Sequence, residues 1–323
     1  MRAADLTAQG EPPAAAEHPD PQAGPGQAVV RMTAAPVVPL DLLCASGTSY
    51  FGPPALPYVP GVQGVGRVES SSRLPAGTRV FVSTSAGMAP GDGSMAELCA
   101  VGEDDLVPLE DGVPDDAVAA IGLSGVAAWM ALTWRAGLRA GERVVVLGAG
   151  GAVGQVGVGA AVALGAGRIV AVCRGEEGRE RALAAGAHAA VAATGDVDRV
   201  AAELRDALEG DADVVLDPVF GAAATAAGRV LAQRGRLVNL GSAAGDSATF
   251  SSALLRSRTA SVLGYTNNAL TAAQKADALT AVLRHAAAGQ ISVAAETLPI
   301  AEAEQAWRRQ AAGTGGIRLV LTP

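Results

Sequence analysis

Short apolar runs separated by glycine and proline dominate the first 118 residues of the chain. Runs of this length, rich in valine and bounded by turn residues, predict strands. The pattern therefore predicts an irregular, mostly β, barrel-like unit. The strand candidates are residues 27–32, 64–69, 77–84 and 95–101.

After Asp115 the pattern changes to longer segments in which strands and helices alternate. This order requires crossover connections, and it predicts a parallel, doubly wound sheet that helices cover on both faces. The predicted strands are 143–147, 168–173, 214–217, 236–241 and 260–264, and the predicted helices are 118–136, from 151, 178–185, 222–232 and 272–288. We expect the β-rich tail, GGIRLVLTP, to return to the first unit.

Composition and charge narrow the class of protein. A chain of 323 residues that is 50% apolar has material for two domains with buried cores. The net charge of −8 argues against nucleic acid or an anionic membrane surface as a partner. The apolar stretches, such as 156–167, are shorter than the roughly 18 residues of a membrane helix, so we expect none.

Three cysteines, at positions 44, 99 and 173, form no CxxC pair. This favours a reducing, cytoplasmic location in which each thiol is a small buried apolar group. The N-terminal residues, MRAADLTAQGEPP, contain no apolar core of a signal peptide, which agrees with that location.

The segment RVVVLGAGGAVGQVGVGAAVALGAGRIVAVCRG has the order strand, glycine turn, helix, strand. Its turn follows the spacing AxGxxG rather than a strict GxGxxG. Glycines there leave the backbone open, so that a pyrophosphate can reach the first amides of the helix. The sequence thus predicts a Rossmann dinucleotide-binding domain. Its phosphate-binding residues are Ala149, Gly150, Gly151, Ala152, Val153 and Gly154.

The end of the second strand indicates which dinucleotide binds. An acidic residue at this place holds the ribose 2′-hydroxyl of NAD, and a basic residue holds the 2′-phosphate of NADP. Arg174 stands there, with Glu176 and Glu177 shortly beyond. We therefore expect NADP(H). The alternative is that Arg174 is a solvated residue at the start of a helix.

From end to end the chain resembles the medium-chain dehydrogenase/reductase superfamily, and within it the zinc-independent quinone oxidoreductase group. The motifs that carry the resemblance are VVPLDLLCASG, LPYVPGVQGVGRV, GSMAELCAV, SGVAAWMAL, LRAGERVVVLGAGGAVG, DVVLDPVFG, GRLVNLGSAAG and GGIRLVLTP.

The resemblance implies a GroES-like catalytic domain formed by residues 1–118 and 260–323, a Rossmann domain formed by residues 119–259, and a homodimer. It also implies further residues of the site. Cofactor contacts are expected from Leu240, Gly241, Ser242 and Tyr265, and a substrate pocket from Val38, Asp41, Val62 and Ala127.

Zinc-dependent members of the superfamily carry metal ligands where this chain has Val38, Val62 and, at about the third position, Leu123. Aliphatic side chains cannot hold Zn²⁺, so we predict no catalytic metal. Val38 and Ala127 also replace an Asn and a Thr that are usual in quinone reductases. A tyrosine expected near Ala193 is absent as well, which puts the substrate class in question.

These residues indicate an NADPH-dependent reductase of a small molecule. Without a metal, hydride transfer to a quinone or an α,β-unsaturated carbonyl compound is favoured, because the charge that develops is delocalised. Two alternatives are an enoyl reductase of secondary metabolism and a non-catalytic, NADP(H)-binding redox sensor. Tyr50 is the candidate proton donor, with Tyr58 as its rival and with solvent as a further source.

Overall fold

The computed structural model describes residues 1–313 and 315–323, and it divides the chain into two compact units. Unit 1 comprises residues 1–122 and 294–323 as far as they are described, and unit 2 comprises residues 123–293. The predicted boundary at 259/260 therefore differs from the observed one at 293/294. Residues 260–293 stay in unit 2 because the strand Ser261–Gly264 pairs in parallel with the sheet of that unit.

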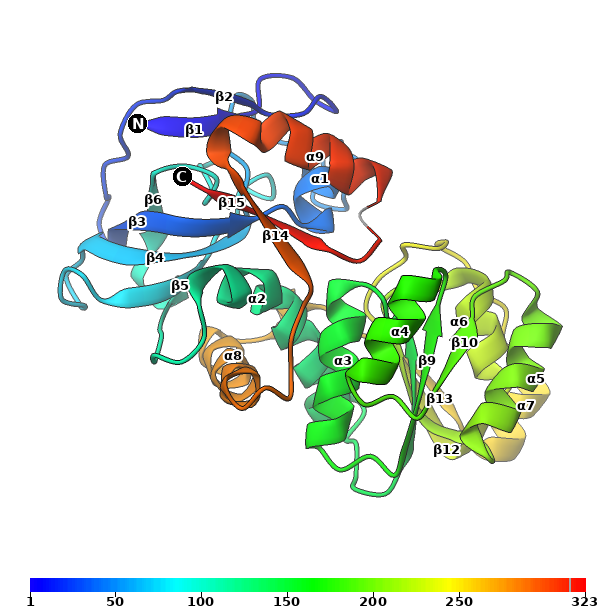
Figure 1. The fold of residues 1–323 in the computed structure, drawn as a ribbon. Helices are drawn as coiled ribbons and strands as arrows, with labels where there is room; N and C mark the ends of the chain where they lie inside the picture. The colour runs from blue at the N-terminus through cyan, green and yellow to red at the C-terminus, as the bar shows by residue number, and fades with distance from the viewer. Residues whose placement is uncertain (314) are drawn as a thin grey trace. The chain divides into compact units, whose positions relative to one another are not determined.

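Unit 1 is built on a seven-stranded sheet in the order β14-β15-β3-β4-β5-β7, with β6 paired to β3 (Figure 1). Its elements are β1 Arg2–Asp5, β2 Ala14–Glu17, β3 Gln27–Pro36, α1 Pro39–Ala45, β4 Gln63–Ser70, β5 Arg79–Ser83, β6 Leu98–Gly102, η1 Glu103–Asp105, β7 Leu106–Pro108, β14 Ala295–Pro299, η4 Ile300–Glu302, α9 Ala303–Ala312 and β15 Arg318–Thr322. The C-terminal strand β15 pairs antiparallel with β3, so the tail returns to this unit as expected.

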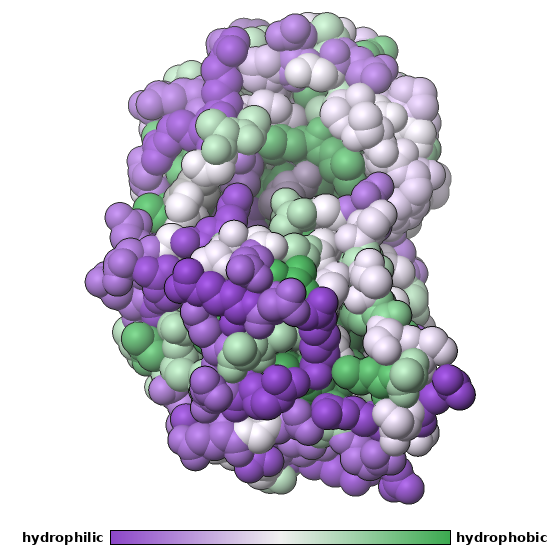
Figure 2. Space-filling view, turned by 90° about the vertical axis from the view of Figure 1, so that its right-hand side faces the viewer, coloured by the Kyte–Doolittle hydropathy of each residue, from purple (hydrophilic) through white to green (hydrophobic). Residues whose placement is uncertain are grey.

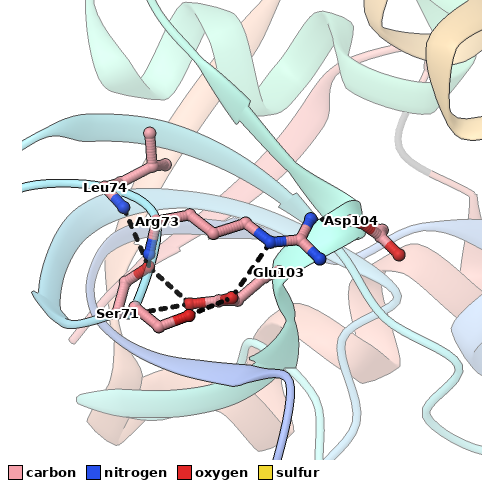
Figure 3. A network of polar contacts seen from close by, with 6 residues as sticks. Ser71, Arg73, Leu74, Glu103 and Asp104 are labelled. Carbon is pink, nitrogen blue, oxygen red and sulfur yellow. Dashed lines mark hydrogen bonds and ion pairs between the residues drawn. The ribbon is translucent and has the colours of Figure 1, made fainter.

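A buried carboxylate fastens two turns of unit 1 to each other (Figure 3). Glu103 accepts hydrogen bonds from the Ser71 hydroxyl at 2.7 Å and from the Ser72 amide at 2.6 Å. It also accepts a bond from the Ser72 hydroxyl at 2.8 Å, and it pairs with the Arg73 guanidinium at 3.2 Å. The turn after β4 is thereby fixed to the end of β6. These contacts lower the pKa of Glu103 to about 2.

Unit 2 has a six-stranded sheet in the order β10-β9-β8-β11-β12-β13, and every pairing in it is parallel. Its elements are η2 Ala131–Arg135, β8 Arg143–Leu147, α3 Ala152–Ala163, β9 Arg168–Cys173, α4 Glu176–Ala184, β10 Ala189–Ala192, α5 Val197–Leu208, β11 Ala212–Asp217, α6 Gly221–Gly228, β12 Leu231–Asn239, α7 Ser252–Arg258, β13 Ser261–Gly264, η3 Asn267–Ala269 and α8 Ala272–Ala287. Helices α3 and α4 lie on one face and α5 and α6 on the other (Figure 1). The predicted doubly wound α/β fold is confirmed.

The strands of unit 2 read as runs of valine, leucine and isoleucine because both faces of the sheet are covered. Val145 and Leu147 of β8, Val170 of β9 and Leu204 of α5 meet in one fully buried cluster. An alanine-rich helix such as α6 can lie close to such strands, because its short side chains leave room for them. This explains how a chain with few aromatic residues fills its core.

The helix α2 (Asp115–Met130) contains the boundary between the units, at Gly122, where the backbone leaves helical geometry with φ 30° and ψ −132°. Together with η2 it forms a 21-residue stretch that is, by length and composition alone, long and apolar enough to cross a membrane. Of its apolar window 67% is buried inside the protein, as in a core helix. On the face seen in Figure 2, hydrophobic residues form separate patches among hydrophilic ones rather than a continuous band.

Candidate functional site

The turn between β8 and α3 is held together by two glycines that its own packing requires. Gly148 has a φ of +59°, and a Cβ atom there would lie 2.5 Å from Cγ1 of Val219. A Cβ atom on Gly154 would lie 2.4 Å from the carbonyl oxygen of Gly148 and 2.5 Å from Cα of Ala149. No side chain fits at either position, so the first turn of α3 lies directly against the end of β8.

Gly151 differs from both, because the fold does not require a glycine at this position. Its φ of −83° and ψ of 168° are accessible to any residue, and an added Cβ would make only an ordinary contact, 3.5 Å from the Gly148 carbonyl oxygen. As the N-cap of α3 it provides no side chain to cap the first amides of the helix. The start of α3 therefore has space beside its N-cap and no capping side chain, and such a helix N-terminus fits an anionic phosphate group.

The turn and the following strand are linked through Cys173, the last residue of β9. The Gly150 amide donates a hydrogen bond to its thiol. Burial raises the pKa of Cys173, and this amide together with Arg179 and Arg181 opposes the shift. All three cysteines are free thiols and buried, which confirms them as small core residues rather than exposed nucleophiles.

Arg174 follows Cys173 and is exposed. A second arginine, Arg179, lies in the first turns of α4, which touches the glycine turn: a Cβ on Gly150 would lie 3.2 Å from Cα of Gly178. Arg179 is half-buried and pairs with Glu176 at 2.8 Å. The sequence analysis missed Arg179, because only the close contact between Gly150 in the turn and Gly178 in α4 brings this helix near the turn. The run GEEGRER contained the only signal for it.

The third part of the site in unit 2 lies at the ends of β12 and β13. The Leu240 amide donates to the Asp217 carbonyl oxygen at 2.9 Å, and Gly241 lies so close to Pro218 that a Cβ would be 2.6 Å from its carbonyl oxygen. The Tyr265 hydroxyl donates to Oδ1 of Asn267 at 2.7 Å, and burial raises the pKa of that hydroxyl. Ser242 is exposed and Leu240 is half-buried.

In unit 1, Asp41 brings together two of the residues expected in the substrate pocket. Its carboxylate, 2% exposed, accepts the Val38 amide at 2.9 Å and the Val62 amide at 3.0 Å. Burial raises the pKa of Asp41 to about 6, although these amides and the buried Arg318 oppose the rise. The fourth expected pocket residue, Ala127, is buried and belongs to unit 2.

The two tyrosines proposed as proton donors differ in environment. Tyr50 is 78% exposed, and its ring lies 4.4 Å from that of Phe51, centre to centre. Tyr58 is 4% exposed and belongs to the core of unit 1, where its backbone pairs with Leu6. Its hydroxyl has no hydrogen-bond partner among the described residues. The packing of Tyr58 is that of a structural residue.

Metal-binding side chains do not gather anywhere in residues 1–313 and 315–323: these residues contain no group of three or more His, Cys, Asp or Glu that could hold an ion. The residues at the positions of the metal ligands in zinc-dependent relatives are valines, Val38 and Val62, whose amides are bound to Asp41.

Two sequence families match this chain. The alcohol dehydrogenase GroES-like domain matches residues 24–111, and a family described as zinc-binding dehydrogenase matches residues 152–284. Among curated proteins, the quinone oxidoreductase of Mus musculus is 34% identical over 166 residues, 50% of this chain and 48% of the relative. The quinone oxidoreductase-like protein 2 of Bos taurus is 30% identical over 229 residues, 69% of this chain and 63% of the relative.

The chain thus spans about half the length of the first of these relatives. Solved structures cover all of it. The quinone oxidoreductase from Thermus thermophilus, which has also been solved in complex with NADPH, is 29% identical, with a TM-score of 0.81 over 100% of both chains. A probable oxidoreductase from Mycobacterium abscessus is 27% identical, with a TM-score of 0.84 over 100% of this chain and 99% of that one.

These likenesses agree with the fold on both sides of the unit boundary. A GroES-like match falls on the β-rich unit, and a dehydrogenase match falls on the parallel sheet with its glycine turn. The chain belongs to the medium-chain dehydrogenase/reductase superfamily and is similar, within it, to the quinone oxidoreductases.

Proposed function

We propose that the protein is an NADPH-dependent reductase that transfers hydride to a quinone or an α,β-unsaturated carbonyl compound without zinc. The observation that carries the proposal is Gly151, which stands at the start of α3 although the packing of the chain would accept a side chain there. A glycine that the packing of the chain does not require supports a ligand, here a phosphate group, at this position. The NADPH complex of the Thermus thermophilus relative supports the choice of dinucleotide.

Three groups of residues bind three parts of the cofactor: the pyrophosphate, the 2′-phosphate and the nicotinamide half. Ala149 to Gly154 receive the pyrophosphate at the amides and positive end of α3. Arg174 binds the 2′-phosphate, with Arg179 on α4 as a second candidate. The side chains of Glu176 and Glu177 pair with Arg179 and Arg181. Leu240, Gly241, Ser242 and Tyr265 contact the nicotinamide half. When bound, NADPH supplies the hydride.

The substrate meets an apolar surface in unit 1. Asp41 holds the backbones of Val38 and Val62, and the position of a metal ligand is thereby taken by an aliphatic side chain. Such a pocket offers no Lewis acid to a simple ketone. It suits an acceptor that delocalises its own negative charge, as quinones and enones do.

Protonation of the reduced substrate completes the reaction. Tyr50 is the proposed donor, because its hydroxyl lies on an exposed segment while that of Tyr58 is enclosed in the core. The hydroxyl of Tyr265 already donates to Asn267. If Tyr50 is only an aromatic residue at the edge of the pocket, water takes over its role.

We also propose a homodimer in the cytoplasm. The strand β13 ends the order of the six-stranded sheet, and Val262 on it is 38% exposed. An uncovered edge strand of this kind is a template for pairing with a second copy. The three reduced, buried cysteines suit a reducing compartment.

The experiment that tests the proposal is a screen of NADPH oxidation with the purified protein against quinones, enones and thioester enoyl compounds. Turnover of quinones or simple enones supports the proposal, and turnover confined to thioesters points to an enoyl reductase. NADPH binding without any turnover would favour a redox sensor. Elemental analysis of untagged protein tests the metal: one zinc per chain, needed for turnover, would refute the zinc-free reaction.

A further inference from the structure

A polar network lies under the loops at the carboxyl ends of β11 and β12, and its centre is Asp217. Its side chain is completely buried. Oδ1 accepts the amides of Val219 at 3.1 Å and Phe220 at 2.7 Å, while Oδ2 accepts Nδ2 of Asn239 at 3.3 Å. All three of these partners are donors, so the carboxylate acts as an acceptor in each contact. Burial raises its pKa and these donors oppose the rise.

Asn239, the last residue of β12, extends this network to the next loop. The same Nδ2 group donates to the carbonyl oxygen of Gly241 at 2.7 Å. One amide group thus has both of its hydrogens engaged, one on the Asp217 carboxylate and one on the backbone of Gly241. This side chain therefore contacts both loops.

The backbone around Asp217 is strained, and the network holds it in place. Phe220 has φ 56° and ψ −152°, a region that a residue with a side chain rarely adopts, and Gly221 follows with φ +67°. Such a conformation persists only where the surroundings fix it, and it gathers at functional sites. The amide of Phe220 is fixed by Asp217, and its ring lies 6.3 Å from that of Phe250.

Backbone contacts bind the same loops over their length. The Leu240 amide donates to the Asp217 carbonyl oxygen at 2.9 Å, and the Ala244 amide donates to that of Val219 at 2.7 Å. Val219 in turn is the residue that a Cβ on Gly148 would strike. The loops after β8, β11 and β12 therefore form one packed layer at the carboxyl edge of the sheet.

The sheet order reverses between β8 and β11, and a dinucleotide lies across such a reversal at the carboxyl edge. With its phosphates at Gly151, its nicotinamide half reaches the loop 240–242 on the β12 side. We infer that Asp217 and Asn239 act together as positioning residues, which hold the 240–242 backbone in the conformation that receives the nicotinamide half of the cofactor. The inference rests on the proposed cofactor site, but not on the proposed substrate.

Binding of two ligands distinguishes a role of Asp217 and Asn239 in positioning the 240–242 loop from a role in the stability of the whole unit. NADPH occupies both halves of the site, whereas 2′,5′-ADP occupies only the half at Gly151 and Arg174. For Asn239→Ala and for Asp217→Asn we expect the Kd of NADPH, measured by calorimetry, to rise at least tenfold, with the Kd of 2′,5′-ADP within twofold of wild type. Asp217→Asn keeps one oxygen acceptor but turns an NH2 group toward that of Asn239. The exposed Asp206→Asn on α5 is the matched control.

The double variant Asp217→Asn/Asn239→Ala tests whether the two residues act as one. We expect its Kd for NADPH to lie within threefold of that of the single variant that binds NADPH less tightly, because both substitutions remove the same hydrogen bond between Asp217 and Asn239. Additive losses would overturn the coupling. Equal weakening of both ligands would assign the network a structural role only, and unchanged NADPH binding would also refute the inference.

One further variant and two wild-type outcomes keep the test decisive. If Asn239→Ala fails to fold, Asn239→Ser takes its place. Its hydroxyl has one hydrogen and cannot donate to both Asp217 and Gly241, so we expect the same selective loss of NADPH affinity. A wild-type protein that binds NADPH but reduces no quinone or enone would end the proposed reaction and leave this inference standing. Wild-type protein that binds neither ligand would overturn both.

Discussion

Under the proposed function, the choice between NADPH and NADH depends on Arg174. A charge-assisted contact to a phosphate gives roughly tenfold to a hundredfold in affinity. Arg174→Ala should therefore lower the ratio of kcat/KM for NADPH over NADH by that factor and leave the use of NADH nearly unchanged. Arg179→Ala should lower the same ratio to a smaller extent, because Glu176 already pairs with its guanidinium.

The control for these variants is Arg199→Ala, since Arg199 forms an exposed ion pair with Glu203 on α5. Steady-state kinetics with both dinucleotides give the ratio directly. A wild-type preference for NADH would contradict the role of Arg174 and would instead favour Glu176 or Glu177 as a residue that binds the ribose 2′-hydroxyl of NAD.

Tyr50 is tested by removal of a single oxygen. Tyr50→Phe should lower kcat at least tenfold and leave the KM for NADPH unaltered, because a positioned acid contributes about 10²–10⁴-fold to such a step. The matched variant, Tyr58→Phe, removes a hydroxyl enclosed in the core and should keep full activity. Full activity in Tyr50→Phe would leave water as the proton source.

The start of α3 offers a contrast between two glycines three positions apart. Gly151→Val should fold, because an added Cβ makes only an ordinary contact there, and should lose most of its NADPH affinity, because the side chain would occupy the proposed phosphate site. Gly154→Ala should instead lose about 1–3 kcal/mol of unfolding free energy, because its Cβ meets backbone atoms that cannot move aside. Calorimetry and denaturant titration measure the two quantities. Undiminished affinity in folded Gly151→Val would place the phosphates elsewhere.

The link between the β4 turn and the β6 end should make unit 1 sensitive to acid. The pKa of Glu103 is about 2 in the folded protein and 4.5 in an ordinary glutamate, so between these values the unfolded chain binds more protons. Its contribution to stability is complete above pH 4.5 and is lost as the pH falls toward 2. Wild type and Glu103→Gln should therefore converge in unfolding midpoint in that range.

The control for this titration is Glu304→Gln, which removes an equal charge from an exposed pair with Arg308 on α9. A constant gap between wild type and Glu103→Gln from pH 5 down to pH 2.5 would contradict the role of the Glu103 carboxylate.

Strong hydrophobic patterns made most elements of both sheets predictable. The valine runs of β8 and β9 were predicted with the bounds that the structure has. The alanine strands β1, β2 and β10 were missed, because alanine carries no strand preference and they are set by pairing alone. The predicted helix 222–232 ends at Gly228, and β12 begins at Leu231, five residues before the predicted strand 236–241. The early part of β12 was missed because it pairs with β11 through an irregularity, with a positive φ of 60° at Arg234, and such a kink leaves no strand pattern in the sequence.

The parts of the candidate site that lie close together in the sequence could be predicted from it. The parts that the fold brings together from distant segments could not. The glycine turn and Arg174 could be identified from spacing. Arg179, and the buried pair of Asp217 and Asn239, could not, because 22 residues separate the members of the pair and only the parallel register of β11 and β12 joins them.

At the scale of the whole molecule, the free edge of β13 allows a direct test of assembly. Val262→Asp should convert a dimer into a monomer in light scattering coupled to gel filtration, because a buried charge opposes pairing of two edge strands. Val162→Asp, on the exposed side of α3, is the control and should leave the mass unchanged. A wild-type mass of one chain would refute the dimer.

The pairing of β15 with β3 sets an order of events during synthesis. All strands of unit 2 lie within residues 143–264, so its sheet can close while the chain is still being made. Unit 1 cannot, since β3 near the N-terminus must wait for residues 318–322 to leave the ribosome. Until then the Ala35–Pro36 end of β3 lacks its partner strand, although β6 already pairs with Gln27–Arg31 of the same strand. This short unpaired end is a place where the nascent chain can meet chaperones or wrong partners.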